Sequence, residues 1–313
     1  MSIVAARAEP GRGRRRRLVS PEAATAYLFV APAVAMLLLL VGYPFVLALY
    51  LATSNAVVGD LGRFVGPAQL TRLLGQEIFQ QTLRNTAIYA LTAVSVKIIL
   101  GLALALILAG FGRHRLPASR LIRAVILLPW IVPTALSTVG WKWMFEPQFS
   151  VINWVLVRLG AIAYISDLQW LGETDLARAA VIMVNIWRGV PFFAINLLAG
   201  LIAIPDELYE AAETDGASPL ARFWFITLPL LRPVLATVVL FSLIMTISDF
   251  NIVYVLTRGG PLNSTHLLAT LAHQVGLVTG EIGRGAAISL FMLPFLMIIV
   301  FYQMRLMRRK WEW

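Results

Sequence analysis

The sequence predicts an all-α integral membrane protein with six transmembrane helices. Of its 313 residues, 59% are hydrophobic and only 13% are charged, whereas soluble domains carry about 25% charged residues. The mean hydropathy is +0.79. The apolar residues also gather in segments of about 20 residues or more, the length that a helix needs to cross the hydrocarbon core of a bilayer.

Six segments meet this length requirement. They extend from Tyr27 to Ala52, Asn85 to Ala109, Leu121 to Phe145, Ala177 to Ile204, Pro233 to Thr257 and Gly285 to Met304. We interpret residues 21–313 as one transmembrane domain and residues 1–20 as a basic tail. The segment Val151 to Ile165 is apolar but shorter and contains Arg158. We expect it to form an amphipathic helix on the outer surface of the membrane.

The basic residues predict the orientation. An even number of spans places both termini on the same side. That side holds most of the arginine and lysine residues, including Arg14 to Arg17 and Arg308 to Lys310. Basic residues favour the cytoplasmic face, so we expect both termini in the cytoplasm. The apolar segment after the first arginine run is too long for a signal peptide, and we interpret it as the first membrane anchor.

The remaining composition predicts neither catalysis nor metal binding. Cysteine is absent, which excludes disulfides and thiolate ligands. His114, His266 and His273 lie too far apart in the sequence to predict a metal site. No phosphate-binding Walker loop is present. The net charge of +10 does not indicate nucleic-acid binding, because the basic residues cluster at the chain ends and between the spans.

The connection between the fourth and fifth spans predicts two short helices separated by a turn. Pro205 suits a helix start, and the acidic residues that follow it are favoured at the positive end of the helix dipole. Gly216 can take the left-handed conformation that ends a helix. Ser218 and Pro219 suit the cap and first residue of the next helix. We expect Pro229 to end that second helix before the fifth span begins.

The same connection carries an acidic patch on the predicted cytoplasmic side of a basic protein. Its members are Asp206, Glu207, Glu210, Glu213 and Asp215. A solvated surface would explain the patch, and so would a docking element for a basic groove on a partner.

This connection resembles the coupling loop of the permease subunits of binding-protein-dependent ABC importers. The motif is carried by Glu210-Ala-Ala, Gly216, Ile226 and Leu228-Pro229. In that family the loop, residues 205–229 here, lies in a groove of a cytoplasmic ATPase and transmits its motion to the membrane helices. The resemblance implies coupling roles for Glu210, Ala211, Ala212, Asp215, Gly216, Ile226, Leu228 and Pro229.

Other segments are similar to carbohydrate-importer permeases. They are Leu127 to Pro133 and Trp141 to Phe145 in the third span, Ile186 to Phe193 and Leu198 to Leu201 in the fourth, and Tyr254 to Pro261 after the fifth. The last segment is typical of the first permease of maltose and glycerol-phosphate systems. Only about the first 20 residues lie outside the likeness, which implies a sugar permease of the bacterial inner membrane.

The resemblance also implies the partners. The chain would have no enzymatic activity of its own, and ATP and magnesium would bind to two partner ATPase subunits. A second homologous permease would complete a heterodimer, and an external solute-binding protein would deliver the sugar.

Polar residues inside the spans are candidates for the substrate path, because charges within a membrane are costly. We expect Arg188 and Asp249 to form an ion pair between the fourth and fifth spans, with direct substrate binding as the alternative. Lys97 is a further charged candidate in the second span. The chemistry of a sugar site is supplied by Asn185, Trp187, Arg188, Asn196, Asp249, Asn251 and Tyr254. The same side chains could instead join helices by hydrogen bonds.

Three other functions are the alternatives to a sugar permease. An importer of an anion such as glycerol phosphate would give Arg188 a larger role. A secondary transporter driven by an ion gradient often has internal repeats, and none is clear here. A membrane-embedded enzyme would need a catalytic cluster near one interface, which the sequence does not show.

Overall fold

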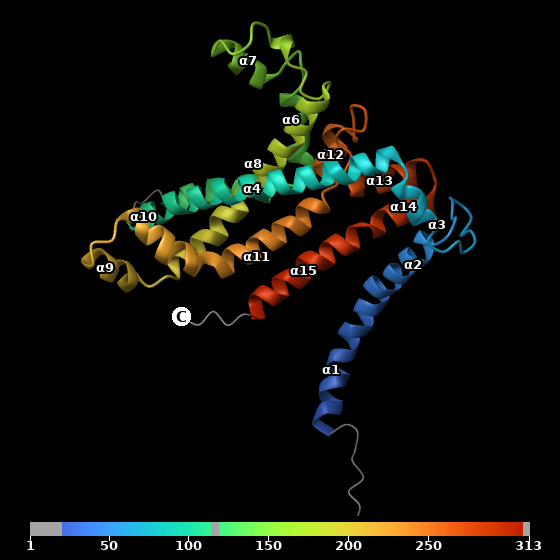
Figure 1. Cartoon of the computed structure of the whole chain (residues 1–313), viewed down its shortest axis with the longest axis horizontal. Helices are drawn as coiled ribbons and strands as arrows, with labels where there is room; N and C mark the ends of the chain where they lie inside the picture. Colours follow the sequence, from blue (N-terminus) through green and yellow to red (C-terminus); the bar gives the residue numbers. More distant parts are fainter. Residues whose placement is uncertain (1–20, 114–118, 309–313) are drawn as a thin grey trace, which may run out of the picture. The chain divides into compact units, whose positions relative to one another are not determined.

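The computed structural model is built almost entirely of helices and describes residues 21–113 and 119–308 (Figure 1). Five of the described helices are long and apolar enough to cross a membrane, and a bent pair of helices is a sixth candidate. The described residues contain isolated β-bridges but no strand. The predicted all-α class is therefore confirmed. The predicted basic tail and the C-terminal residue Lys310 lie outside the described residues.

The chain divides into two compact units, residues 1–48 and 49–313. The boundary falls inside the first predicted span. The first unit contains α1 (Pro21–Leu37), a π-helical turn (Leu38–Gly42) and most of α2 (Tyr43–Ala52). None of its described side chains is buried. A helix that is apolar on all sides requires an apolar surrounding, so this unit is suited to lipid or to contact with another membrane protein.

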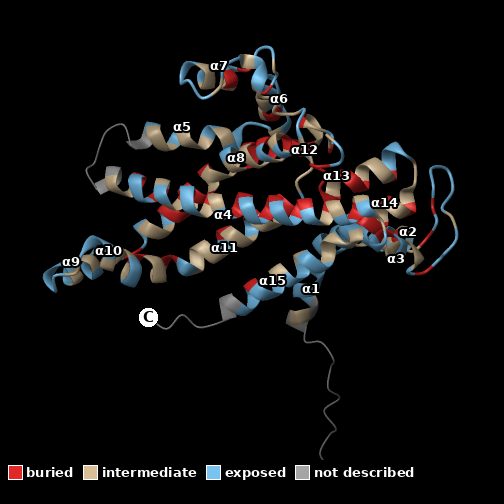
Figure 2. Ribbon diagram, turned by 45° about the horizontal axis from the view of Figure 1, so that its top comes forward, coloured by how far each residue is buried: buried red, intermediate tan, exposed pale blue. Residues whose placement is uncertain are grey.

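The core of the second unit is formed by α4 (Glu77–Arg113), α8 (Thr174–Ile202) and α11 (Leu228–Ile247), which pack along one another (Figure 1). Glycines allow close approach at two of the crossings. A Cβ at Gly101 would lie 2.3 Å from the Cβ of Phe193, and one at Gly200 would lie 2.7 Å from Leu231. Figure 2 shows the buried residues of α4 and of neighbouring segments.

The third predicted span, Leu121 to Phe145, is not a straight helix. It consists of α5 (Ser119–Ile131) and α6 (Thr134–Met144), whose axes meet at 89°. Pro133 lies at the bend with extended backbone angles. A proline lacks an N–H donor and disfavours a helical conformation at the residue before it. The bend follows from this proline.

The fifth predicted span, Pro233 to Thr257, differs from the expectation at both ends. Its helix begins earlier, because α10 (Pro219–Arg222), a π-helical turn (Phe223–Thr227) and α11 follow one another without a break. The helix then stops at Ile247, and α12 (Asn251–Leu256) begins after three residues. The span is therefore broken inside the predicted membrane region.

The prediction that Pro229 ends the second loop helix is wrong. The N–H of Leu228 bonds to the carbonyl of Phe223, five residues back, which widens the helix by one residue. Pro229 then falls in the first turn of α11, where a proline is tolerated. The same order of a π-helical turn followed by a proline occurs at Leu38–Gly42 and Pro44.

The remaining elements are shorter helices and the sixth span. They are α3 (Ala68–Leu74), α7 (Val151–Arg158), a 3-10 turn (Ile165–Asp167), α9 (Asp206–Thr214), α13 (Leu268–His273) with a π-helical turn (Gln274–Val278), α14 (Ile282–Leu290) and α15 (Met292–Arg308). The last two form the sixth span.

The segment expected to lie on the membrane surface is a shorter helix that packs on its own loop. Asn153 of α7 is buried, and its amide donates to the carbonyls of Ile165 and Leu168 at 2.7 and 2.8 Å. Its side-chain oxygen accepts from Trp170 Nε1 at 2.7 Å. These contacts fix α7 to residues 165–170, while Trp154 remains exposed.

Candidate functional site

The loop between the fourth and fifth spans has the turn that its residues predict. Gly216 takes a left-handed conformation with φ +77°. The Ser218 hydroxyl accepts a hydrogen bond from the N–H of Ala221 at 3.2 Å and caps α10, in which Pro219 occupies the first turn. The two helices of the loop are α9 and the start of the long α10–α11 helix. We call α9, the turn at Gly216 and residues 219–227 the coupling hairpin.

The acidic side chains of the coupling hairpin are exposed. None of the described residues of α9 is buried. The Glu213 carboxylate pairs with Arg222 Nη1 at 3.0 Å. The Glu210 carboxylate has no ion-pair or hydrogen-bond partner among the described residues. An exposed helix with a surplus of carboxylates is suited to a basic partner surface.

A cavity of about 510 Å³ lies beside the break in the fifth span. Residues of α4, α5, α6, α8, α11 and α12 and of the break line it. Four of the seven substrate-path candidates are among them: Asn185, Arg188, Asp249 and Asn251. The other three lie outside the lining. Asn196 bonds to the carbonyl of Phe192, Trp187 packs edge-on against Trp141, and Tyr254 stacks on Phe250.

Asp249 is held by neutral donors, and the predicted ion pair with Arg188 is wrong. Its Oδ2 accepts from the Tyr89 hydroxyl at 2.6 Å and from Asn185 Nδ2 at 3.0 Å. Its Oδ1 accepts from the N–H of Ile252 at 3.3 Å. No ion pair joins Arg188 to Asp249 in the part of the chain that the structure describes. The carboxylate instead joins α4, α8 and the broken fifth span at one point.

Lys97 is the charged residue of this region that is most fully enclosed, with 3% of its surface exposed. Its Nζ donates to Thr246 Oγ1 at 3.1 Å, in the last turn of α11 before the break. The lysine side chain passes over Gly189, where a Cβ would lie 2.5 Å from the Lys97 Cε. Glycine at position 189 therefore makes room for the lysine next to Arg188.

Two buried polar atoms in the cavity lining have no hydrogen-bond partner among the described residues. They are Asn185 Oδ1 and Arg188 Nε. Buried polar groups are normally hydrogen-bonded, so each of these atoms requires an explanation. One is an acceptor and the other a donor, and they lie three residues apart on one face of α8.

Aromatic side chains form another part of the cavity wall, and the sequence interpretation did not select them. Trp130 stacks on Phe192 with ring centroids 5.7 Å apart, and Phe192 packs against Phe241 at 5.7 Å. Phe250 lines the cavity at the break. Phe192 lies four residues after Arg188 and seven after Asn185 on the same helix, a spacing that could have indicated it, but the others come from distant spans.

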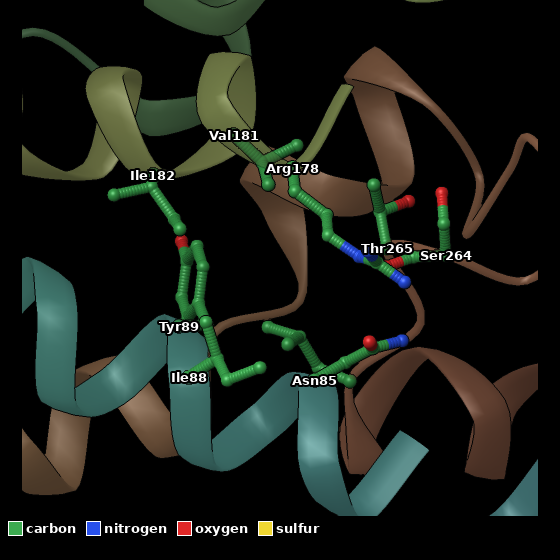
Figure 3. A pocket seen from close by; sticks show the side chains of 9 residues that line it. Asn85, Ile88, Tyr89, Arg178, Val181, Ile182, Ser264 and Thr265 are labelled. Carbon is green, nitrogen blue, oxygen red and sulfur yellow. The ribbon is translucent and has the colours of Figure 1, made fainter. Parts of the chain in front are cut away.

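The N-terminal parts of α4 and α8 are tied to the segment that leaves the fifth span (Figure 3). Asn85 Nδ2 donates to the carbonyls of Asn263 and His266 at 3.0 and 3.3 Å. Arg178 Nε donates to the carbonyl of Ser264 at 3.0 Å. A small cavity of about 20 Å³ lies between them, which is room for about one water molecule. We call these contacts the N-terminal tie.

Comparison with known proteins gives consistent matches over the chain. The family described as "Binding-protein-dependent transport system inner membrane component" matches residues 97–312. The trehalose/maltose transport system permease protein MalF of Thermococcus litoralis is 36% identical over 281 residues, covering 90% of this chain and 92% of that protein. The diacetylchitobiose uptake system permease protein DasB of Streptomyces coelicolor is 33% identical over 307 residues, covering 96% and 92%.

A solved structure shares the fold. A chain of a bacterial ABC transporter involved in the import of the acidic polysaccharide alginate superimposes with a TM-score of 0.77 at 20% identity. The match covers 92% of this chain and 96% of that chain.

Proposed function

Because the chain belongs to the family of binding-protein-dependent transport system inner membrane components, we propose that it is the permease subunit of an ATP-driven importer that translocates a sugar. The family assignment makes it a multi-pass transport permease of the inner membrane. The named solutes of its relatives, trehalose, maltose and diacetylchitobiose, support a sugar as the substrate. Glycerol phosphate, the anionic alternative, is less favoured, since the corresponding relative is only 28% identical.

The proposed complex contains the partners that an importer of this family requires. Two ATPase subunits bind ATP and magnesium and act on the cytoplasmic side. A second homologous permease forms a heterodimer with this chain, and an external solute-binding protein delivers the sugar. Both termini lie in the cytoplasm, which the distribution of arginine and lysine supports.

The coupling hairpin is the proposed ATPase contact. Glu210 is exposed and is followed by the two small residues Ala211 and Ala212, which allow another protein to approach the helix closely. Asp215 adds charge beside the turn at Gly216. Ile226, Leu228 and Pro229 lie where the hairpin enters the fifth span, so they connect the contact to the membrane helices.

The cavity beside the broken fifth span is the proposed substrate path, and the two unpartnered atoms of α8 carry this assignment. A sugar hydroxyl both donates and accepts hydrogen bonds. Sugar hydroxyls can therefore satisfy both atoms, donating to Asn185 Oδ1 and accepting from Arg188 Nε. The apolar faces of Phe192 and Phe250 are available to the C–H face of a sugar ring.

Transport by the reconstituted complex tests the proposal. Candidate disaccharides are supplied with the binding protein, and uptake and substrate-stimulated ATP hydrolysis are measured in proteoliposomes. We expect Asn185→Leu and Arg188→Met to lower uptake roughly 5- to 150-fold, because each leaves one hydrogen-bonding group of the buried sugar unpaired, at a cost of about 1–3 kcal/mol.

Asn196→Leu is the matched control. It removes an asparagine from the same helix, but that side chain bonds to its own helix and does not line the cavity. It should leave uptake close to the wild-type value. Normal uptake of every transported sugar by both cavity variants would exclude this cavity as the substrate path.

A further inference from the structure

The coupling hairpin is closed by two side-chain contacts between its helices. The Tyr209 hydroxyl of α9 and Thr227 Oγ1 lie 2.9 Å apart. The Glu213 carboxylate and Arg222 Nη1 lie 3.0 Å apart. Both contacts join α9 to the helix that continues as the fifth span. The turn at Gly216 links α9 to that helix along the chain.

The two contacts differ in environment. The Glu213 side chain is 71% exposed and that of Arg222 is 22% exposed. Surface ion pairs of this kind contribute little because water and salt screen them. Thr227 is buried, with 5% of its surface exposed, and Tyr209 is half-buried. The Tyr209–Thr227 hydrogen bond lies in the less hydrated position and is therefore the stronger of the two contacts.

Thr227 occupies a mechanically important position. It is the last residue of the π-helical turn, directly before α11. Its hydroxyl also lies 3.4 Å from the carbonyl of Arg222, a carbonyl in the turn where the helical register changes. A contact at Thr227 therefore acts on the base of the fifth span and not on the tip of the hairpin.

We propose that Tyr209 and Thr227 are positioning residues that fasten α9 to the base of the fifth span, so that a displacement of α9 moves α11 with it. The inference rests on the proposed function of the coupling hairpin. It separates two tasks on neighbouring residues: exposed Glu210 makes the ATPase contact, and half-buried Tyr209 transmits the motion.

Removal of one hydroxyl should reduce coupling without reducing assembly. A single neutral hydrogen bond shifts an equilibrium by roughly two- to tenfold. We expect Tyr209→Phe and Thr227→Val each to lower the number of solute molecules transported per ATP by a factor in this range. Because both variants remove the same bond, the loss in the double variant should be smaller than the product of the two single losses.

The experiment uses the complete importer in proteoliposomes, with uptake and ATP hydrolysis measured on the same preparation and ATPase attachment measured by co-purification. Thr227→Ser keeps the hydroxyl and should restore most of the wild-type transport ratio. Thr214→Val is the matched control, since its hydroxyl bonds only to the carbonyl of Glu210 within α9. It should leave the ratio unchanged.

Three results would overturn the proposal: a wild-type ratio in both Tyr209→Phe and Thr227→Val, additive losses in the double variant, or loss of ATPase attachment in either single variant. Glu210→Lys is measured in parallel. If that variant loses the ATPase while the hydroxyl variants transport normally, the hairpin still binds the ATPase and only the role of the two hydroxyls is wrong.

Discussion

Asp249 is the residue at which three spans meet. The sequence identifies it and Arg188 as charges inside the membrane, and both do line the cavity. The sequence does not reveal which neutral donors come near the carboxylate, because Tyr89 and Asn185 are far from Asp249 in the chain and uncharged. A charge in a span can be recognised from its position, whereas its partners depend on the packing of the other spans.

The aromatic wall of the cavity could not be predicted for a similar reason. Phenylalanine and tryptophan are common in membrane spans, and their sequence positions do not distinguish a cavity wall from a lipid-facing surface. Trp130 and Phe192 are brought together by the contact between α5 and α8. Their role is visible only when the helices are placed.

His266 makes residues 257–270 sensitive to pH. The residue is buried, and burial lowers the pKa of its imidazole, which bonds to Thr270 Oγ1 at 3.1 Å. An unperturbed imidazole has a pKa of about 6.5. The neutral His266 imidazole therefore contributes fully to stability at pH values above the unperturbed pKa. This contribution is lost as the pH falls through the lower folded-state pKa, because the unfolded segment then binds more protons than the folded one.

Hydrogen exchange of residues 257–270 checks this expectation. After correction for intrinsic rates, amide exchange there should be several-fold faster at pH 5 than at pH 7. His266→Gln, which does not titrate, should remove the difference even if it changes the protection itself. Equal protection of the native segment at both pH values would show that His266 does not control it.

At the scale of elements, the coupling hairpin was the most predictable part of the chain. Its turn follows from Gly216, Ser218 and Pro219, whose conformational preferences are local. The expectation for Pro229 failed because the preceding π-helical turn changes the register, and that turn has no local sequence signature. The 89° bend at Pro133 is the converse case, in which a proline did interrupt the helix.

Substitution of Gly216 tests whether the hairpin requires a left-handed backbone conformation at its turn. A Cβ at this position would have no atom within 4 Å, but the residue has φ +77°. The expected penalty of Gly216→Val is therefore conformational, roughly 1–2 kcal/mol, and larger for a β-branched residue. We expect ATPase co-purification and substrate-stimulated hydrolysis to fall, while docking of the solute-binding protein persists.

Gly216→Asn is the control for this prediction, since asparagine tolerates the left-handed region. It should retain most of the coupling. Glu210→Lys should weaken attachment by placing a positive charge against a basic groove. If Gly216→Val and Glu210→Lys both leave attachment, hydrolysis and uptake at normal levels, the hairpin is not the coupling element.

At the scale of the whole molecule, class and family were predictable, but the division into units was not. Composition and the length of apolar segments depend on many residues together, so one misassigned residue does not change the class that they predict. The unit boundary at residue 48 depends instead on which spans pack against one another. The first span is as apolar as the others, and its sequence does not distinguish it from them.

The number of crossings can be tested with reporter fusions. If the bent pair α5–α6 crosses the membrane, fusions after Gly59 and after Gly260 should both report the external side. If the pair does not cross, the fusion after Gly59 remains external and the one after Gly260 becomes cytoplasmic. The distribution of basic residues favours the first outcome.

The helix from Pro219 to Ile247 joins the coupling hairpin to the cavity without an intervening loop. It has a length of roughly 43 Å at the usual rise per residue. Its lower end belongs to the surface that an ATPase would hold, and its upper end carries Ser242 and Thr246 in the cavity wall. Beyond the break, the N-terminal tie holds residues 263–266 to α4 and α8. Under the proposed function, a displacement of the coupling hairpin would therefore reach Ser242 and Thr246 through one continuous helix, while the far side of the break stays held by the tie.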